Sequence, residues 1–116
     1  MPVEVSRRRF ERLVDRALDS VPERLLAMAD NVVVEVAEAN EEEPGLLGLY
    51  WGIALTERGS DYTFAMPDTI YVYRQPLQEL AADEAELEHE IRVTVVHELA
   101  HHFGIDDDRL HDLGWG

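Results

Sequence analysis

The chain of 116 residues contains no cysteine, which excludes disulfide bonds and thiolate metal sites. It also has no hydrophobic run near the ~20 residues that a membrane-spanning helix requires. Its N-terminus carries arginines, but no apolar stretch of the kind found in secretory signals follows them. Together these absences predict a cytoplasmic protein without a membrane partner.

Lysine is absent as well, so all ten basic residues are arginine, against 25 acidic residues and a net charge of −15. This acidity disfavours a nucleic-acid partner and favours cationic over anionic peptides. Five of the arginines lie between Arg7 and Arg16, which makes that segment locally basic. A solvated helix face explains it most simply, and docking or self-association as a homodimer is the alternative.

The length and the 46% content of hydrophobic residues predict one folded domain covering residues 1–116. Apolar spacing of three and four residues predicts a helix over 6–20, N-capped by Ser6. Weaker patterns predict a short helix (22–29), a strand (32–36), a long loop or loop-flanked short strand (45–67), a strand ended by Pro76 (69–74) and a helical turn (77–82).

The clearest predicted element is a long helix over residues 84–103, with Asp83 as N-cap and Glu86 completing a capping-box-like pair. Every fourth residue along it is apolar, at Leu87, Ile91, Val95, Leu99 and Phe103. This stripe lies largely away from the face that carries His97 and His101. We therefore expect an α+β fold in which a small sheet and N-terminal helices pack against the back of this helix, while its histidines face a cleft.

Residues 97–107 read H-E-x-x-H-x-x-G-x-x-D, the most informative pattern in the chain. On a helix, His97 and His101 lie one turn apart on one face, close enough to share a metal ion. Glu98 lies about 100° round the helix, from where it reaches a metal-bound water without ligating the metal. Gly104 then allows the chain to reverse, and Asp107 to return as a third ligand. Two imidazoles and one carboxylate suit a catalytic Zn²⁺.

Three consecutive aspartates compete for the third position. The spacing after Gly104 selects Asp107, whereas Asp106 is placed to cap a following short helix. Asp108 is placed to hydrogen-bond a ligating imidazole from outside the ligand set. No glutamate follows Glu98, which excludes a glutamate ligand from a later helix.

Further candidates surround this motif. His111 is a candidate for polarising a carbonyl or stabilising a transition state, and Arg109, Tyr50, Tyr71 and Tyr73 are candidates for the substrate cleft and oxyanion stabilisation. His102 points about 100° away from His101, which argues against a ligand role. We assign His89 to the surface, and Glu90 either to the cleft or to the surface.

The segment from Val96 to Leu110 resembles the small bacterial zincin-like metallopeptidases, and residues 47–50 and 67–74 are similar to the same family. The resemblance implies an α+β zincin-like domain acting as a zinc-dependent metallopeptidase. Carried over by position, it implies His97, His101 and Asp107 as zinc ligands and Glu98 as the catalytic acid/base. It also implies that the strand over 70–74 holds the substrate peptide by β-addition, as an edge strand does in larger zincins.

The chain departs from the metzincin pattern in having no methionine after the motif, since its methionines are Met1, Met28 and Met66. Trp115 or Leu113 is the candidate for the apolar floor under the site. The small size leaves a thin substrate-binding wall, which shallow peptide binding or a partner subunit would accommodate.

We expect hydrolysis of peptides or unstructured protein segments by zinc-activated water. A non-catalytic, weakly metallated binding module is the alternative. Metal-dependent RNA hydrolysis is a third interpretation, which Glu98 and the −15 charge both oppose.

Overall fold

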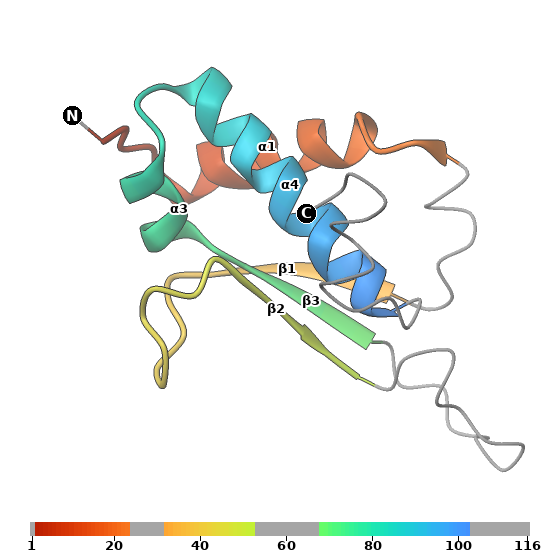
Figure 1. Ribbon diagram of the computed structural model, residues 1–116. Helices are drawn as coiled ribbons and strands as arrows, with labels where there is room; N and C mark the ends of the chain where they lie inside the picture. Colours follow the sequence, from red (N-terminus) through yellow and green to blue (C-terminus); the bar gives the residue numbers. More distant parts are fainter. Residues whose placement is uncertain (1, 24–31, 53–67, 103–116) are drawn as a thin grey trace, which may run out of the picture.

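The computed structural model describes residues 2–23, 32–52 and 68–102 of the chain. It contains a three-stranded sheet covered on one face by helices, the α+β arrangement that the sequence predicts (Figure 1). In chain order the elements are α1 (Arg7–Asp19), β1 (Val32–Ala37), β2 (Gly48–Trp51), β3 (Asp68–Tyr73), α3 (Arg74–Leu80) and α4 (Glu84–His102).

The sheet has the order β1-β3-β2, so β3 is its central strand. β1 pairs with β3 in parallel over its whole length, from Val32 opposite Asp68 to Ala37 opposite Tyr73. β2 pairs antiparallel to β3, with Gly48 opposite Val72. The expectation that the strand over 70–74 is a substrate-binding edge is therefore wrong, because β1 and β2 already pair with both sides of β3. Within the described residues the edge strands are β1 and β2.

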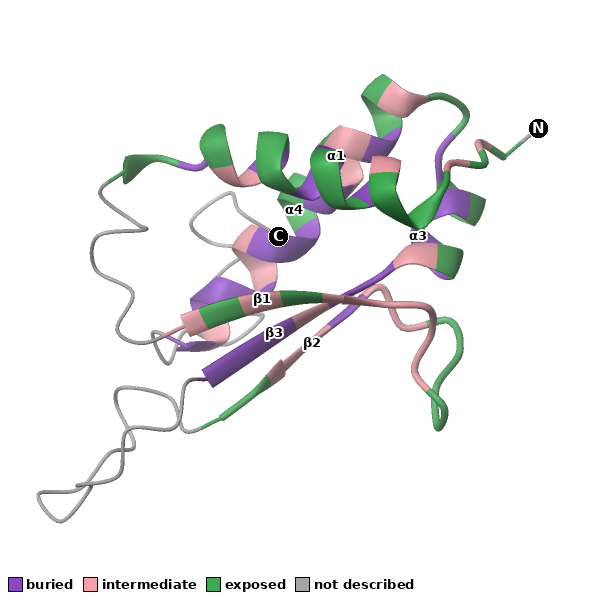
Figure 2. Cartoon of the chain, turned by 180° about the vertical axis from the view of Figure 1, so that it is seen from behind, coloured by how far each residue is buried: buried purple, intermediate pink, exposed green. Residues whose placement is uncertain are grey.

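α1 forms where the sequence predicts it. The Ser6 side chain accepts a hydrogen bond from the Arg9 backbone N–H, which satisfies one of the donors that every helix N-terminus leaves unpaired. Its apolar face is buried against the rest of the fold (Figure 2). That face consists of Phe10, Leu13, Val14 and Ala17.

α4 also forms as predicted, with Asp83 at its N-cap accepting from the Glu86 N–H at 2.8 Å. The described members of its apolar stripe, from Leu87 to Leu99, are all buried in one core with Ile70 and Val72 of β3. The back of α4 thus packs on the sheet, and His97 and His101, both half-buried, lie on another face of the helix.

The connection from β3 to α3 differs from the prediction. The helix begins at Arg74 rather than at residue 77, and Pro76 is its third residue instead of a strand terminator. A proline is tolerated there because the first-turn N–H groups have no partner within the helix. The predicted helix over 22–29 and most of the loop over 53–67 lie outside the described residues.

The basic face of α1 pairs within the chain. Arg9 donates to Glu84 at 2.8 Å, and the Arg16 guanidinium lies 2.7 Å from Glu88, both carboxylates being on α4. Arg7 donates to the Val36 carbonyl of β1. These arginines therefore connect α1 to α4 and to the sheet. Among the helices the structure describes, none combines the length and the hydrophobicity needed to cross a bilayer.

One ion pair makes a testable contribution to stability. Arg74 donates to both oxygens of Glu38, at 2.9 Å for the Nε–Oε2 pair, and to the Val5 carbonyl at 2.7 Å. The hydrogen bond from Arg74 holds the pKa of Glu38 below its ordinary value of 4.5, against the opposing effect of burial. A lowered folded-state pKa contributes stability above the unfolded-state pKa, and this contribution disappears as the pH falls through the folded-state value.

We expect Glu38→Gln to lower the free energy of unfolding at pH 7 by about 0.5 kcal/mol, a modest amount because the Glu38 side chain is 39% exposed. The difference from wild type should shrink as the pH falls below 4.5. Urea unfolding at a series of pH values measures it, with the exposed Glu35→Gln as control. A deficit that is independent of pH would contradict this assignment.

Candidate active site

His97 and His101 lie on one face near the end of α4, one turn apart. Their ring centroids are 5.0 Å apart with an interplanar angle of 63°, and both residues are half-buried. Two imidazoles at this separation are compatible with Zn–N bonds of about 2.0–2.1 Å from each ring. The donor types and their spacing therefore fit a zinc ion.

Glu98 is buried, with 8% of the residue exposed. One of its carboxylate oxygens lies 3.2 Å from Nδ1 of His101, a contact that is charged when the imidazole is protonated. The helix thus places a carboxylate directly beside one candidate ligand. A group in this position is available for proton transfer at the candidate metal site.

The remaining predicted site residues, Asp106, Asp107, Asp108, Arg109 and His111, lie outside the described residues, as do Leu113 and Trp115. Within residues 2–23, 32–52 and 68–102, no group of three His, Cys, Asp or Glu side chains is arranged to hold a metal ion. The choice of Asp107 as third ligand therefore stays a prediction from the sequence.

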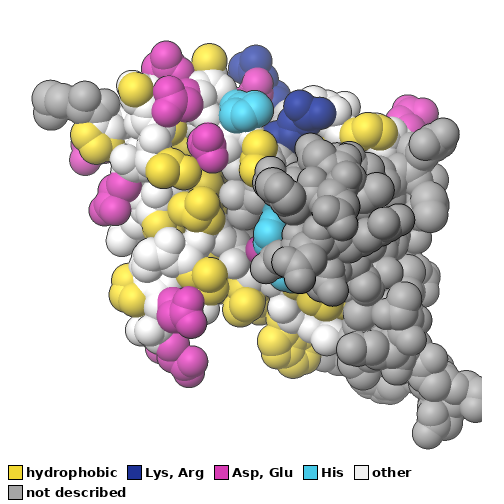
Figure 3. Space-filling model, viewed as in Figure 1, with side chains coloured by type: hydrophobic (Ala, Val, Ile, Leu, Met, Phe, Trp, Pro, Cys, Tyr) yellow, Lys and Arg dark blue, Asp and Glu magenta, His cyan; other side chains and the backbone are white. Residues whose placement is uncertain are grey.

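A cavity of about 340 Å³ adjoins this part of α4. One wall is the segment of residues 45–48 that leads into β2, and the other is one face of α4. The α4 residues that line it are Val93, Thr94, His97 and Glu98. On the face of the molecule drawn in Figure 3, hydrophobic side chains in yellow gather beside histidine atoms in cyan. The cavity is thus a largely apolar space that ends at the candidate catalytic residues.

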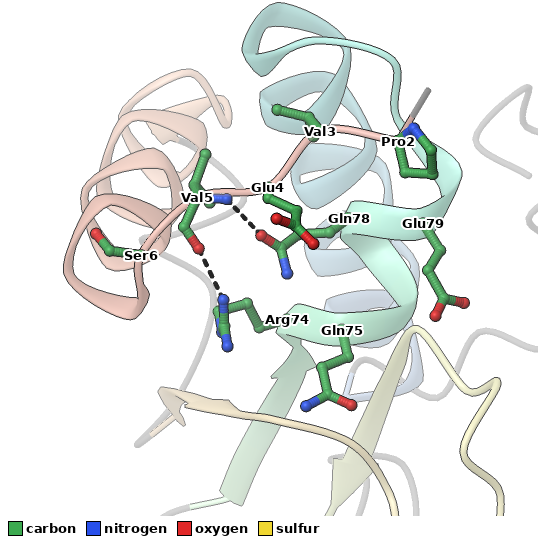
Figure 4. Close-up of a pocket in the computed structure, with 9 residues that line it drawn as sticks. All are labelled: Pro2, Val3, Glu4, Val5, Ser6, Arg74, Gln75, Gln78 and Glu79. Carbon is green, nitrogen blue, oxygen red and sulfur yellow. Dashed lines mark hydrogen bonds between the residues drawn. The ribbon is translucent and has the colours of Figure 1, made fainter.

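A larger hollow of about 760 Å³ lies elsewhere, between the N-terminal segment and α3 (Figure 4). Its polar side chains bond to the chain itself, since Gln78 accepts from the Val5 N–H and Arg74 donates to the Val5 carbonyl. None of the described residues that line it is a histidine. Of these two cavities, the smaller one is therefore the one lined by a candidate metal ligand, His97, and by Glu98.

His102 is fully buried and belongs to a polar cluster that the motif does not predict. Its Nδ1 lies 2.8 Å from Oδ2 of Asp68, the first residue of β3. The same oxygen accepts a hydrogen bond from the hydroxyl of Tyr50 on β2 at 2.5 Å. A Cβ at Gly52 would overlap the Asp68 carboxylate, so the backbone also approaches this group closely. The cluster joins the end of α4 to two strands of the sheet.

Only part of this cluster has a signal in the sequence. The prediction that His102 stays out of the metal ligand set is consistent with its burial against Asp68. Tyr50 is predicted as a cleft residue, and its hydroxyl instead bonds to Asp68. Asp68 lies in the segment 67–74 that resembles the zincin-like family, but that resemblance assigns it no role. Only the pairing of β2 with β3 brings these three side chains together.

Tyr71 and Tyr73, predicted as cleft residues, do not line the cavity beside His97. They stack on each other with ring centroids 6.3 Å apart. Because side chains alternate along a strand, they point away from the face on which Ile70 and Val72 pack against α4. The Tyr73 hydroxyl accepts a hydrogen bond from the Asn40 amide. Neither tyrosine therefore lines the cavity beside His97 in the part of the chain that the structure describes.

Comparison with known proteins finds a family and a solved structure to which the chain is similar. The family model for zincin-like metallopeptidases matches residues 29–115, which is most of the chain. Among solved structures, the chain is similar to a conserved hypothetical protein from Thermo thermophilus, with 26% sequence identity and a TM-score of 0.56. That match covers 94% of this chain and 97% of the other. No curated protein matches significantly.

Proposed function

Because this chain belongs to the zincin-like metallopeptidase family, we propose that it is a zinc-dependent peptidase that cleaves peptides or unstructured protein segments. The observation that carries the proposal is the arrangement at the end of α4. There His97 and His101 share a face, and the buried Glu98 contacts His101 and borders an open cavity. Asp107 is the proposed third ligand.

A zinc ion held by these side chains would lower the pKa of a coordinated water and polarise the scissile carbonyl. The residues of the chain have separate tasks. Glu98 takes the proton of the attacking water at its carboxylate and passes it to the nitrogen of the leaving amine. His97 and His101, fixed on a helix whose back is buried in the core, keep the donor geometry constant during turnover.

The charge of the chain supports cationic substrates. A net charge of −15 raises the local concentration of positively charged peptides and repels anionic ones. Because exposed charges are screened by salt, this preference should weaken as the ionic strength rises.

The metal content of the protein tests the proposal. We expect purified wild-type protein supplied with zinc to bind about one ion per chain. Loss of a residue that only supports a metal ligand weakens metal affinity by up to roughly 100-fold. His97→Ala removes a proposed ligand itself, so we expect it to weaken zinc affinity by more than this. Competition with a chromogenic chelator measures the affinity.

His89→Ala is the matched control, since His89 is an exposed histidine two turns earlier on the same helix. It should bind zinc as wild type does. Wild-type protein that stays free of zinc at micromolar metal, or equal losses in the two variants, would exclude the proposed site.

A further inference from the structure

The larger hollow, of about 760 Å³ between the N-terminal segment and α3, plays no part in the proposed function. One wall is formed by residues 2–6, and the other by one face of α3, which carries Arg74, Gln75, Gln78 and Glu79 (Figure 4). In Figure 1, α3 lies near the beginning of α4, whereas His97 lies roughly 20 Å along that helix from its first residue. A small ligand bound in this hollow would therefore not reach the candidate metal site.

Gln78 presents its side-chain amide to this hollow. The residue is 8% exposed, and its Oε1 accepts a hydrogen bond from the Val5 N–H at 2.6 Å. That bond fixes the orientation of the amide, so Nε2 faces the hollow instead of the Val5 backbone (Figure 4). Within the part of the chain that the structure describes, Nε2 donates to no other group. Its N–H groups are therefore available to an acceptor on a ligand.

Arg74 supplies further donors one turn before Gln78 on α3. Its hydrogen bonds to Glu38 and to the Val5 carbonyl use the Nε–H and one N–H each of Nη1 and Nη2. The second N–H of Nη1 and that of Nη2 have no acceptor among the described residues, and Arg74 lines the hollow. Gln78 and Arg74 thus form a floor of hydrogen-bond donors, which suits the two oxygens of a carboxylate.

Glu4 adds a negative charge on the other wall. Its side chain is exposed, and it forms no ion pair with any residue that the structure describes. The pKa of Arg74 is held above its ordinary value, chiefly by the hydrogen bond to Glu38 against the opposing effect of burial, and in part by the charge of Glu4. Because Glu38 already neutralises Arg74, Glu4 and Glu79 leave the hollow with an excess of negative charge. This excess opposes a ligand that carries only negative charge.

We propose that the larger hollow binds a small zwitterion with one carboxylate and one ammonium group, the chemistry of a free amino acid or a short peptide. The carboxylate of the ligand accepts hydrogen bonds from Gln78 and Arg74, and its ammonium group lies against the Glu4 carboxylate. A purely cationic ligand would leave the donors of Gln78 and Arg74 without an acceptor. The site is separate from the proposed metal centre and does not depend on the proposed function.

Titration of the isotope-labelled protein with alanine, Ala-Ala and Ala-Ala-Ala, followed by nuclear magnetic resonance, tests the proposal. We expect the backbone signals of residues 2–6 and 74–79 to shift, with a dissociation constant of about 1 mM or below for the best of the three ligands. The length of that ligand distinguishes a site for free amino acids from a site for peptides. Absence of these shifts at about 20 mM ligand would overturn the inference.

Blocked ligands and one variant test the two charges and the location. The N-acetylated and the C-terminally amidated forms of the best ligand each lack one charge, so each should bind at least about fivefold more weakly. His97→Ala should bind the unblocked ligand as wild type does, because His97 does not line the larger hollow. Equal affinity of the blocked forms, or loss of binding in His97→Ala, would contradict the proposal.

Two further variants test the assigned side chains. Gln78→Glu keeps an oxygen that accepts from the Val5 N–H but removes the N–H groups that face the ligand, so we expect binding to weaken by at least about tenfold. Glu4→Gln removes the charge of an exposed side chain and should weaken binding by about two- to fivefold. Glu41→Gln is the control and should bind as wild type does, since Glu41 is exposed and does not line the hollow. If Gln78→Glu does not fold, Glu4→Gln still decides, because equal affinities in Glu4→Gln and Glu41→Gln would exclude the site.

Discussion

Replacing Glu98 with glutamine is expected to reduce zinc-dependent peptide hydrolysis by about 10²- to 10⁴-fold, the usual contribution of a general base. Glutamine has nearly the same shape and fits the same buried position, but it cannot take a proton from water. Zinc content should stay at the wild-type value, because Glu98 is not a proposed ligand. The measurement is kcat/KM on a cleaved peptide together with metal analysis of the same sample.

Glu90→Gln is the control for this experiment, since Glu90 is a half-buried glutamate two turns earlier on α4. It should keep hydrolysis within a few fold of wild type. Full activity in Glu98→Gln would remove Glu98 from the mechanism. Zinc binding without hydrolysis of any peptide by wild type would instead favour the alternative function, a zincin-like binding module.

The second large effect is on stability. Asp68→Ala is expected to lower the free energy of unfolding by about 3–5 kcal/mol, because it leaves a fully buried imidazole and the Tyr50 hydroxyl without their shared carboxylate. Since small domains are stable by only about 5–15 kcal/mol, this is a large fraction of the total. Urea unfolding followed by tryptophan fluorescence or circular dichroism measures the change.

Tyr50→Phe gives a graded version of the same test. It removes one hydrogen bond to Asp68 and should cost about 1–1.5 kcal/mol. Tyr71→Phe, on the opposite face of the sheet, should change stability by less than about 0.5 kcal/mol. If Asp68→Ala were as mild as Tyr71→Phe, the cluster would not support the fold as described.

The two experiments also distinguish a loss of catalysis from a loss of folding stability. Glu98→Gln should lose activity at unchanged stability, whereas Asp68→Ala should lose stability first. In Asp68→Ala, zinc binding should weaken in proportion to the unfolded fraction, because the cluster secures the end of α4 that carries His101. An added stabilising osmolyte should then restore part of the zinc affinity.

Much of this protein could be predicted from local sequence patterns, for a physical reason. Helix periodicity and capping involve residues three or four positions apart, so Ser6 and α1, Asp83 and α4, and the shared face of His97 and His101 are all encoded by near neighbours. The zincin-like family and the α+β class follow from the same local signals, and both are confirmed.

Strand pairing could not be predicted in this way, because it joins residues far apart in sequence. The strand over 70–74 has the composition of either an edge or a central strand, and only the contacts on both its sides make it central. That arrangement makes β2 the edge beside α4 and turns Tyr71 and Tyr73 away from the cleft. It also determines where the cavity beside His97 and Glu98 lies.

The sequence alone therefore determined the shared helix face of His97 and His101 and the position of Glu98 beside them, since H-E-x-x-H on a helix places these side chains without help from other elements. The tertiary structure decided what surrounds these side chains. It placed the His102 imidazole and the Tyr50 hydroxyl on the same carboxylate oxygen of Asp68. It also left an apolar cavity between α4 and the segment leading into β2. Such contacts join residues that lie far apart in the sequence, so local sequence patterns do not predict them.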